Sequence, residues 1–125
     1  MQARDKVKTV GLASNPLKEG AADLAGELIA WLEPRGLVPV LIPETAVSLG
    51  RPDLGAEDDI IAQSDLIIVL GGDGTMLRWN RLAAPYGTPM LGVNFGHYGF
   101  ITEIEPDAVQ ESLERILAGD YLISE

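Results

Sequence analysis

The chain has 125 residues, enough to bury the core of one domain but short for an enzyme that must hold two substrates. It contains no cysteine, which excludes disulfides, thiolate nucleophiles and cysteine-ligated metal sites. The formal net charge of −10 argues against binding nucleic acid through bulk electrostatics, so a polyanionic ligand would need backbone amides, a few arginines or a metal ion.

The first part of the chain predicts a strand, a helix and a second strand. Residues 7–13 form the first strand, which Ser14-Asn15-Pro16 ends. The helix is predicted by apolar residues that recur at i, i+3, i+4, i+7, i+8 and i+11: Ala21, Leu24, Ala25, Leu28, Ile29 and Leu32. Pro34-Arg35-Gly36 ends this helix, and residues 37–42 form the second strand.

The middle of the chain predicts a loop, a short helical turn and a buried strand. Residues 43–55 mix proline, glycine, serine and scattered charge, which indicates a surface loop. A helical turn over 57–63 leads into Leu-Ile-Ile-Val-Leu at 66–70, a run typical of a strand buried on both faces. Beyond it we expect a helix through Met76 and Leu82, with Thr75 as its N-cap.

The last part of the chain predicts one more strand and one more helix. Pro85-Tyr86-Gly87 ends the preceding helix, and residues 90–93 form the fourth strand. A second glycine-rich loop covers 94–102, and a final helix begins near Pro106 and closes at Gly119. Residues 121–125 resemble the opening of another strand, so we expect the chain to be cut within an element.

Strands that alternate with helices predict the α/β class, with a parallel sheet flanked by helices. In such sheets ligands bind beyond the carboxyl ends of the strands. Both glycine-rich loops follow strands directly, so both are expected at that edge.

The Gly-Gly-Asp-Gly-Thr segment at 71–75 is typical of a phosphate-binding turn between a strand and a helix N-terminus. Such a turn presents backbone N–H groups and the positive end of the helix dipole to an anion. Its glycines let a ligand approach the backbone, and Asp73 is the one reactive side chain. A simple tight turn is the alternative, because glycine and aspartate are common in loops. The strand before and the helix after favour the functional interpretation.

Two familiar phosphate motifs are absent from the chain. There is no Gly-x-x-x-x-Gly-Lys-Ser/Thr sequence, so the chain is not a P-loop ATPase. Leu77 stands where a dinucleotide fingerprint would have its third glycine, so that match fails as well.

Asp73 suggests phosphoryl transfer. A carboxylate beside phosphates is repelled unless it accepts a hydroxyl proton or binds a metal ion. In a phosphoryl-transfer site such a group orients the attacking alcohol and accepts its proton. Arg78 and Arg81 in the following helix can offset the negative charge, and the alternative for both is a solvated arginine on a helix face.

The remaining conspicuous side chains carry weaker signals. His97 is the only histidine, which argues against a zinc site, so we predict no metal ligands in this chain. The Gly-His-Tyr-Gly sequence at 96–99 matches an RNA-binding clamp only weakly, and the acidic charge opposes it. Phe100 is expected to stack on a base or to pack inward, whereas Trp31 and Trp79 are predicted to be core residues.

Together, these motifs resemble the N-terminal domain of NAD kinases. The resemblance covers most of the chain: Asn-Pro at 15–16, the segment 71–75, and Leu-Gly-Val-Asn at 91–94 followed by Gly-His-Tyr-Gly-Phe-Ile-Thr-Glu at 96–103. The first glycine-rich segment is shared with lipid kinases and phosphofructokinase-like enzymes. The second loop singles out NAD kinases.

The resemblance implies an enzyme that phosphorylates the adenosine 2′-hydroxyl of NAD, using ATP with Mg²⁺ or, in some members, polyphosphate. It implies that Asp73 is the catalytic base and that Phe100 packs against the adenine. The residues expected to bind the nucleotide are Gly71, Gly72, Asp73, Gly74, Thr75, Arg78 and Phe100.

Three features depart from the family pattern. Tyr98 stands where leucine is usual, although the neighbouring glycines are kept. The family's later Asn-Glu or Asn-Asp pair is missing, and so is its β-rich C-terminal domain. We therefore expect residues 1–125 to be an N-terminal α/β domain truncated before a second domain, and inactive or nearly so alone.

Two other functions remain open, a diacylglycerol-type lipid kinase domain and a non-catalytic module that binds a dinucleotide. The loop at 94–100 argues against the lipid kinase. The first eight residues are polar and no apolar run approaches the roughly 18 residues that span a bilayer. We therefore expect a cytoplasmic protein with small-molecule substrates, without nucleic-acid or membrane partners. The resemblance further implies a dimer or tetramer for the full-length protein.

Overall fold

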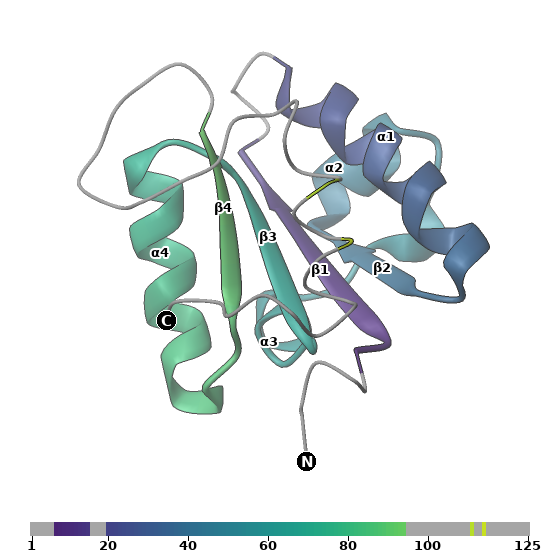
Figure 1. The fold of residues 1–125 in the computed structure, drawn as a ribbon. Coiled ribbons are helices and arrows are strands. Elements are labelled where there is room, and N and C mark those ends of the chain that lie inside the picture. The colour runs from purple at the N-terminus through teal and green to yellow at the C-terminus, as the bar shows by residue number, and fades with distance from the viewer. Residues whose placement is uncertain (1–6, 16–19, 95–110, 112–113, 115–125) are drawn as a thin grey trace.

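The fold is built on a parallel sheet whose strands come from both halves of the chain (Figure 1). The computed structural model describes residues 7–15, 20–94, 111 and 114, with the backbone alone at positions 73 and 94. Within these residues the strands are β1 (Thr9–Ser14), β2 (Val38–Leu41), β3 (Leu66–Gly71) and β4 (Met90–Asn94). All three pairings are parallel and the strand order is β2-β1-β3-β4.

The order of the strands contains a reversal at β1. The chain passes from β1 to β2 on one side and then crosses to β3 and β4 on the other side. The carboxyl ends of β1 and β3 therefore border the point at which the connections change direction. In open parallel sheets ligands bind at such a point.

Helices cover both faces of the sheet. Helices α1 (Ala21–Leu32) and α2 (Pro43–Ser48) share one hydrophobic cluster with one face, whereas α3 (Asp58–Ala62) and α4 (Asp73–Ala83) share a second cluster with the other face. Figure 1 shows α1 and α4 flanking the sheet. Leu66 to Leu70 are all 0% exposed because β3 is central and covered on both faces. None of the helices among the described residues has the length and apolarity needed to cross a membrane.

Most predicted elements agree with the structure to within two residues. Helix α1 has the bounds expected from the periodicity, and its buried residues are the six that define the apolar repeat. Trp79 is buried at 1% exposure, as predicted, and Trp31 is partly buried beneath the guanidinium of Arg35. The final helix lies outside the described residues except for Glu111 and Glu114, which are helical.

The prediction of a loop over residues 43–55 was wrong. This segment contains α2 and the 3₁₀ helix η3 (Pro52–Leu54). Pro43 occupies a first helical position, where its fixed φ favours a helix and its missing N–H costs nothing. Thr45 and Ala46 are buried, so α2 is held by packing that the mixed composition does not reveal.

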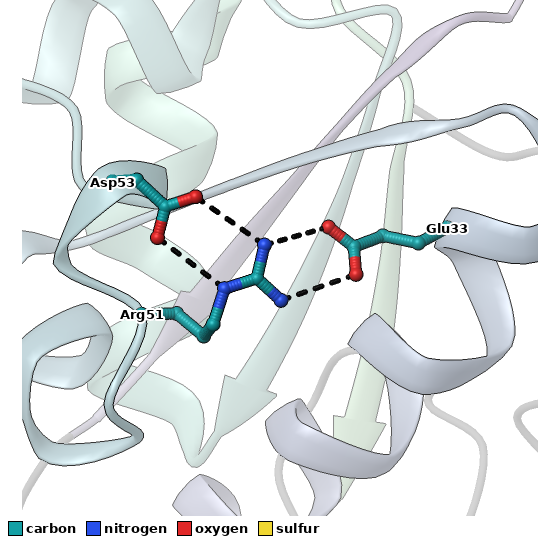
Figure 2. A network of polar contacts seen from close by, with 3 residues as sticks. All are labelled: Glu33, Arg51 and Asp53. Carbon is teal, nitrogen blue, oxygen red and sulfur yellow. Dashed lines mark hydrogen bonds and ion pairs between the residues drawn. The ribbon is translucent and has the colours of Figure 1, made fainter.

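Arg51 joins this segment to the residue that follows the C-terminal end of α1 (Figure 2). Its guanidinium donates to both carboxylate oxygens of Glu33, at 2.8 and 3.1 Å, and to both oxygens of Asp53, at 3.3 Å each. Glu33 begins the 3₁₀ helix η2 (Glu33–Arg35), which directly follows α1. The hydrogen bonds from Arg51 lower the pKa of both carboxyl groups.

Candidate functional site

The carboxyl ends of three strands meet at one edge of the sheet. In the strand register Ser14 lies beside Leu70, and Gly71 lies beside Asn94. Beyond the register, the backbone N–H of Asn15 donates to the carbonyl oxygen of Leu70 at 3.0 Å. The first glycine-rich segment therefore emerges at the carboxyl edge, as the sequence predicted, and the structure places it between the end of β1 and the end of β4.

The turn from β3 to α4 is very short. Gly71 is the last residue of β3 and Asp73 is the first residue of α4, so Gly72 alone connects them. Gly72 is extended, with φ −108° and ψ −161°, and its carbonyl oxygen accepts the N–H of Met76 at 3.0 Å. The first turn of α4 thus begins directly at the carboxyl edge of the sheet.

This geometry corrects the predicted start of the helix. The N-cap is Gly72 rather than Thr75, and α4 begins two residues before Thr75, because the first helical hydrogen bond closes on the Gly72 carbonyl. A helix has no internal acceptors for its first N–H groups, which here come from the glycine-rich segment itself. These N–H groups and the positive end of the α4 dipole make this turn suitable for an anionic ligand.

The glycines of the segment have two different roles. A Cβ atom on Gly71 would lie 2.8 Å from Oγ1 of Thr75, so this glycine provides space for a protein side chain. A Cβ on Gly72 or Gly74 would meet no atom within 4 Å, so those two leave the backbone open. None of the three has a positive φ, and the need for glycine here concerns space rather than backbone conformation.

The predicted site residues lie in different environments, and some lie outside the described residues. Asp73 is the first residue of α4, where an acidic residue is favoured by the helix dipole. Thr75 is half-buried against Gly71, and Gly74 is exposed. Phe100, together with residues 95–102 of the second loop, lies outside the described residues.

Arg78 faces α3. Its Nη2 forms an ion pair with Oδ2 of Asp58, and its guanidinium lies 5.7 Å from the centre of the Trp79 ring. The sequence offered no signal for the Asp58 partner, which is 20 residues away. Arg81 is exposed in the last turn of α4, about 12 Å along the helix axis from Asp73 at 1.5 Å per residue.

A buried polar pair lies at the end of β1 and was not predicted. The Ser14 and Thr45 hydroxyl oxygens are 2.9 Å apart, and both residues are at most 2% exposed. This hydrogen bond joins the carboxyl end of β1 to α2. It was missed because the segment of Thr45 was assigned to a loop.

The described part of the chain holds no group of three or more His, Cys, Asp or Glu residues that could ligate a metal ion. These residues therefore do not fit a metal site built by the protein alone.

Comparison with known proteins matches the chain to NAD kinases. The family model described as the ATP-NAD kinase N-terminal domain matches residues 10–121. An NAD kinase of Heliobacterium modesticaldum is 47% identical over 121 residues, covering 94% of this chain and 41% of that protein. An NAD kinase of Moorella thermoacetica is 42% identical over 120 residues, covering 95% of this chain and 38% of that protein. The chain thus spans about 40% of the length of these curated relatives.

A solved structure shows the same fold. Yeast NADH kinase in complex with NADH superimposes with a TM-score of 0.76 at 18% sequence identity. The match covers 91% of this chain and 39% of the yeast chain.

Proposed function

The chain belongs to the ATP-NAD kinase family, whose N-terminal domain it matches over residues 10–121, and from that premise we propose that the full-length protein is an NAD kinase. It transfers a phosphoryl group to the 2′-hydroxyl of the adenosine ribose of NAD and forms NADP. The donor is ATP or polyphosphate. The observation that carries this proposal is the turn at 71–75, which leaves β3 beside the ends of β1 and β4.

In the proposed reaction Asp73 is the general base. The 2′-oxygen forms a bond to the terminal phosphorus of the donor while the bond from that phosphorus to its bridging oxygen breaks. The hydroxyl proton passes to the Asp73 carboxylate, and the electron pair of the broken bond leaves with the remaining phosphate chain. The position of Asp73 at the start of α4, directly after β3, supports this role.

The nucleotide is proposed to bind along the same edge. The open backbone at Gly72 and Gly74 gives phosphate or ribose oxygens room to reach the N–H groups of the first helical turn. Arg78 contributes positive charge and Phe100 packs against the adenine, as the resemblance implies. ATP enters with Mg²⁺ as part of the substrate.

We propose further that residues 1–125 are the N-terminal domain of a longer cytoplasmic protein that assembles as a dimer or tetramer. A second domain supplies much of the NAD site, so the 125-residue chain alone is inactive or nearly so. The share of the relatives' length that the chain spans supports this division.

The test is NADP formation by the full-length protein, with NAD and NADH as acceptors and with Mg-ATP and polyphosphate as donors. We expect Asp73→Asn to keep NAD binding and to lower kcat by at least about 10²-fold, since loss of a general base costs that much. Glu27→Gln makes the same chemical change at an exposed position on α1, across the sheet, and should leave kcat unchanged.

Two results would contradict the proposal. Full activity in Asp73→Asn would show that Asp73 is not the general base of the proposed reaction. A wild-type protein that binds NAD but forms no NADP with either donor would instead be a non-catalytic dinucleotide-binding module.

A further inference from the structure

We infer that Gly71 and Thr75 form a packing pair that positions Asp73, and that Thr75 is a positioning residue rather than a ligand contact. The kinetic part of this inference rests on the proposed function, because it concerns the presentation of the proposed base. The packing itself can be tested without any activity.

The contact between the two residues is close. An added Cβ on Gly71 would lie 2.8 Å from Oγ1, 3.0 Å from Cβ and 3.3 Å from Cγ2 of Thr75. All three heavy atoms of the threonine side chain therefore lie close to the position that a Cβ on Gly71 would take. Carbon and oxygen atoms that are not bonded do not approach to 2.8 Å without a shift, so only glycine fits beneath this side chain.

The two partners are anchored on elements that have little freedom to move. Gly71 ends β3, whose five preceding residues are 0% exposed between two layers of helices. Thr75 directly precedes Met76, which is 2% exposed, and Trp79 one turn later is 1% exposed. Displacing either partner would therefore disturb a close-packed core.

Asp73 lies between these two anchored points. With only Gly72 between the strand and the helix, the approach of Thr75 to Gly71 sets where the first turn of α4 begins relative to β3. Threonine suits this task because its branched Cβ restricts χ1 and gives the side chain a defined shape. The open surroundings of Gly72 and Gly74 mean that no comparable contact holds those residues.

The shape of Thr75 and its hydroxyl group can be separated by substitution in the full-length protein. Thr75→Val keeps the branched shape and removes the hydroxyl, whereas Thr75→Ser keeps the hydroxyl and removes a methyl group. If Thr75 acts by packing, we expect Thr75→Val to keep kcat and the KM for NAD within about threefold, because valine has the same branched Cβ. We expect Thr75→Ser to lose more in kcat. Loss of activity in Thr75→Val, together with full activity in Thr75→Ser, would show that the hydroxyl contacts a ligand and would overturn the inference.

Gly71→Ala tests the other half of the pair. We expect kcat to fall roughly 10- to 100-fold with little change in the KM for NAD, because displacing a catalytic group by about 1 Å can cost about 10²-fold. Thr75→Ala removes the atoms at 2.8 and 3.3 Å, so the double variant Gly71→Ala/Thr75→Ala should be more active than Gly71→Ala alone. If the kcat losses of the two single variants simply multiply in the double variant, the two positions are not coupled and the inference is contradicted.

Thermal unfolding of the wild-type full-length protein, Gly71→Ala, Thr75→Ala and the double variant separates this inference from the proposed function. We expect Gly71→Ala to lower Tm, and to lower it less in the Thr75→Ala background. We also expect Gly71→Ala to shift the amide resonances of Asp73 and Gly74. A wild-type protein without kinase activity would refute the proposed function, and additive Tm changes with unshifted amides would refute the packing pair.

Discussion

Nη2 of Arg78 on α4 is paired with Oδ2 of Asp58 on α3, so a residue expected to bind the dinucleotide is engaged with a neighbouring helix. Both side chains are about half exposed, at 57% and 44%. Ion pairs at such positions contribute about 0–1 kcal/mol because water screens them and the side chains lose entropy. The pair therefore adds little to stability.

Two variants separate the contribution of this pair to stability from the role of Arg78 in NAD binding. Both Asp58→Asn and Arg78→Met break the ion pair, and we expect each to lower the free energy of unfolding by less than about 1 kcal/mol. Only Arg78→Met should weaken NAD binding by the full-length protein, as measured by calorimetry. Equal NAD affinity in Arg78→Met and wild type would show that Arg78 contacts α3 and does not bind the dinucleotide.

The Arg51 bridge predicts a pH-dependent stability. Its hydrogen bonds lower the folded-state pKa of Glu33 and Asp53, so their contribution is complete above the unfolded-state pKa values and disappears as the pH falls through the lower folded-state values. We expect Arg51→Met to lower Tm at pH 7, and this difference to shrink as the pH falls below the usual carboxyl pKa range of about 4. A Tm difference of the same size at pH 7 and at pH 2.5 would show that Arg51 acts by packing instead.

Gly11 in β1 is predicted to tolerate no side chain. An added Cβ would lie 2.9 Å from Cγ2 of Ile61 and 3.2 Å from Oγ of Ser64, both against the covered face of the sheet. We expect Gly11→Ala to destabilise the fold by about 1–3 kcal/mol in urea unfolding, because α3 must move away from β1.

Gly26 provides the matched control. It lies within α1, and an added Cβ would make only an ordinary contact, 3.7 Å from Cδ2 of Leu49. We expect Gly26→Ala to stabilise the protein by up to about 1 kcal/mol, since alanine favours a helix more than glycine does. Equal effects of the two substitutions would contradict the difference in packing.

The Ser14–Thr45 hydrogen bond predicts a non-additive pair of substitutions. Thr45→Val keeps the shape of the side chain but leaves the Ser14 hydroxyl buried without this partner, at a cost of about 1–3 kcal/mol. Ser14→Ala in the Thr45→Val background removes that hydroxyl too, so the double variant should recover part of the loss. Urea unfolding of the four proteins measures the coupling, and additive losses would argue against it.

Local patterns in the sequence determined the class of fold and the place of the candidate site. The apolar repeat of α1 and the uninterrupted apolar run of β3 reflect how each element meets the core, and such spacing is readable without tertiary information. The order of strands and helices indicated a parallel sheet. The glycine-rich segment after β3 therefore had to lie at the carboxyl edge, where the structure has it.

The tertiary structure alone decided which atoms meet across that framework. Helix α2 exists because Thr45 and Ala46 are buried, although its local composition favours a loop. Asp58 is the partner of Arg78. The three glycines at 71, 72 and 74 divide into one that packs against Thr75 and two that leave the backbone open. These contacts depend on how closely elements distant in sequence approach one another. The spacing of residues within a single element does not encode the distance between two elements.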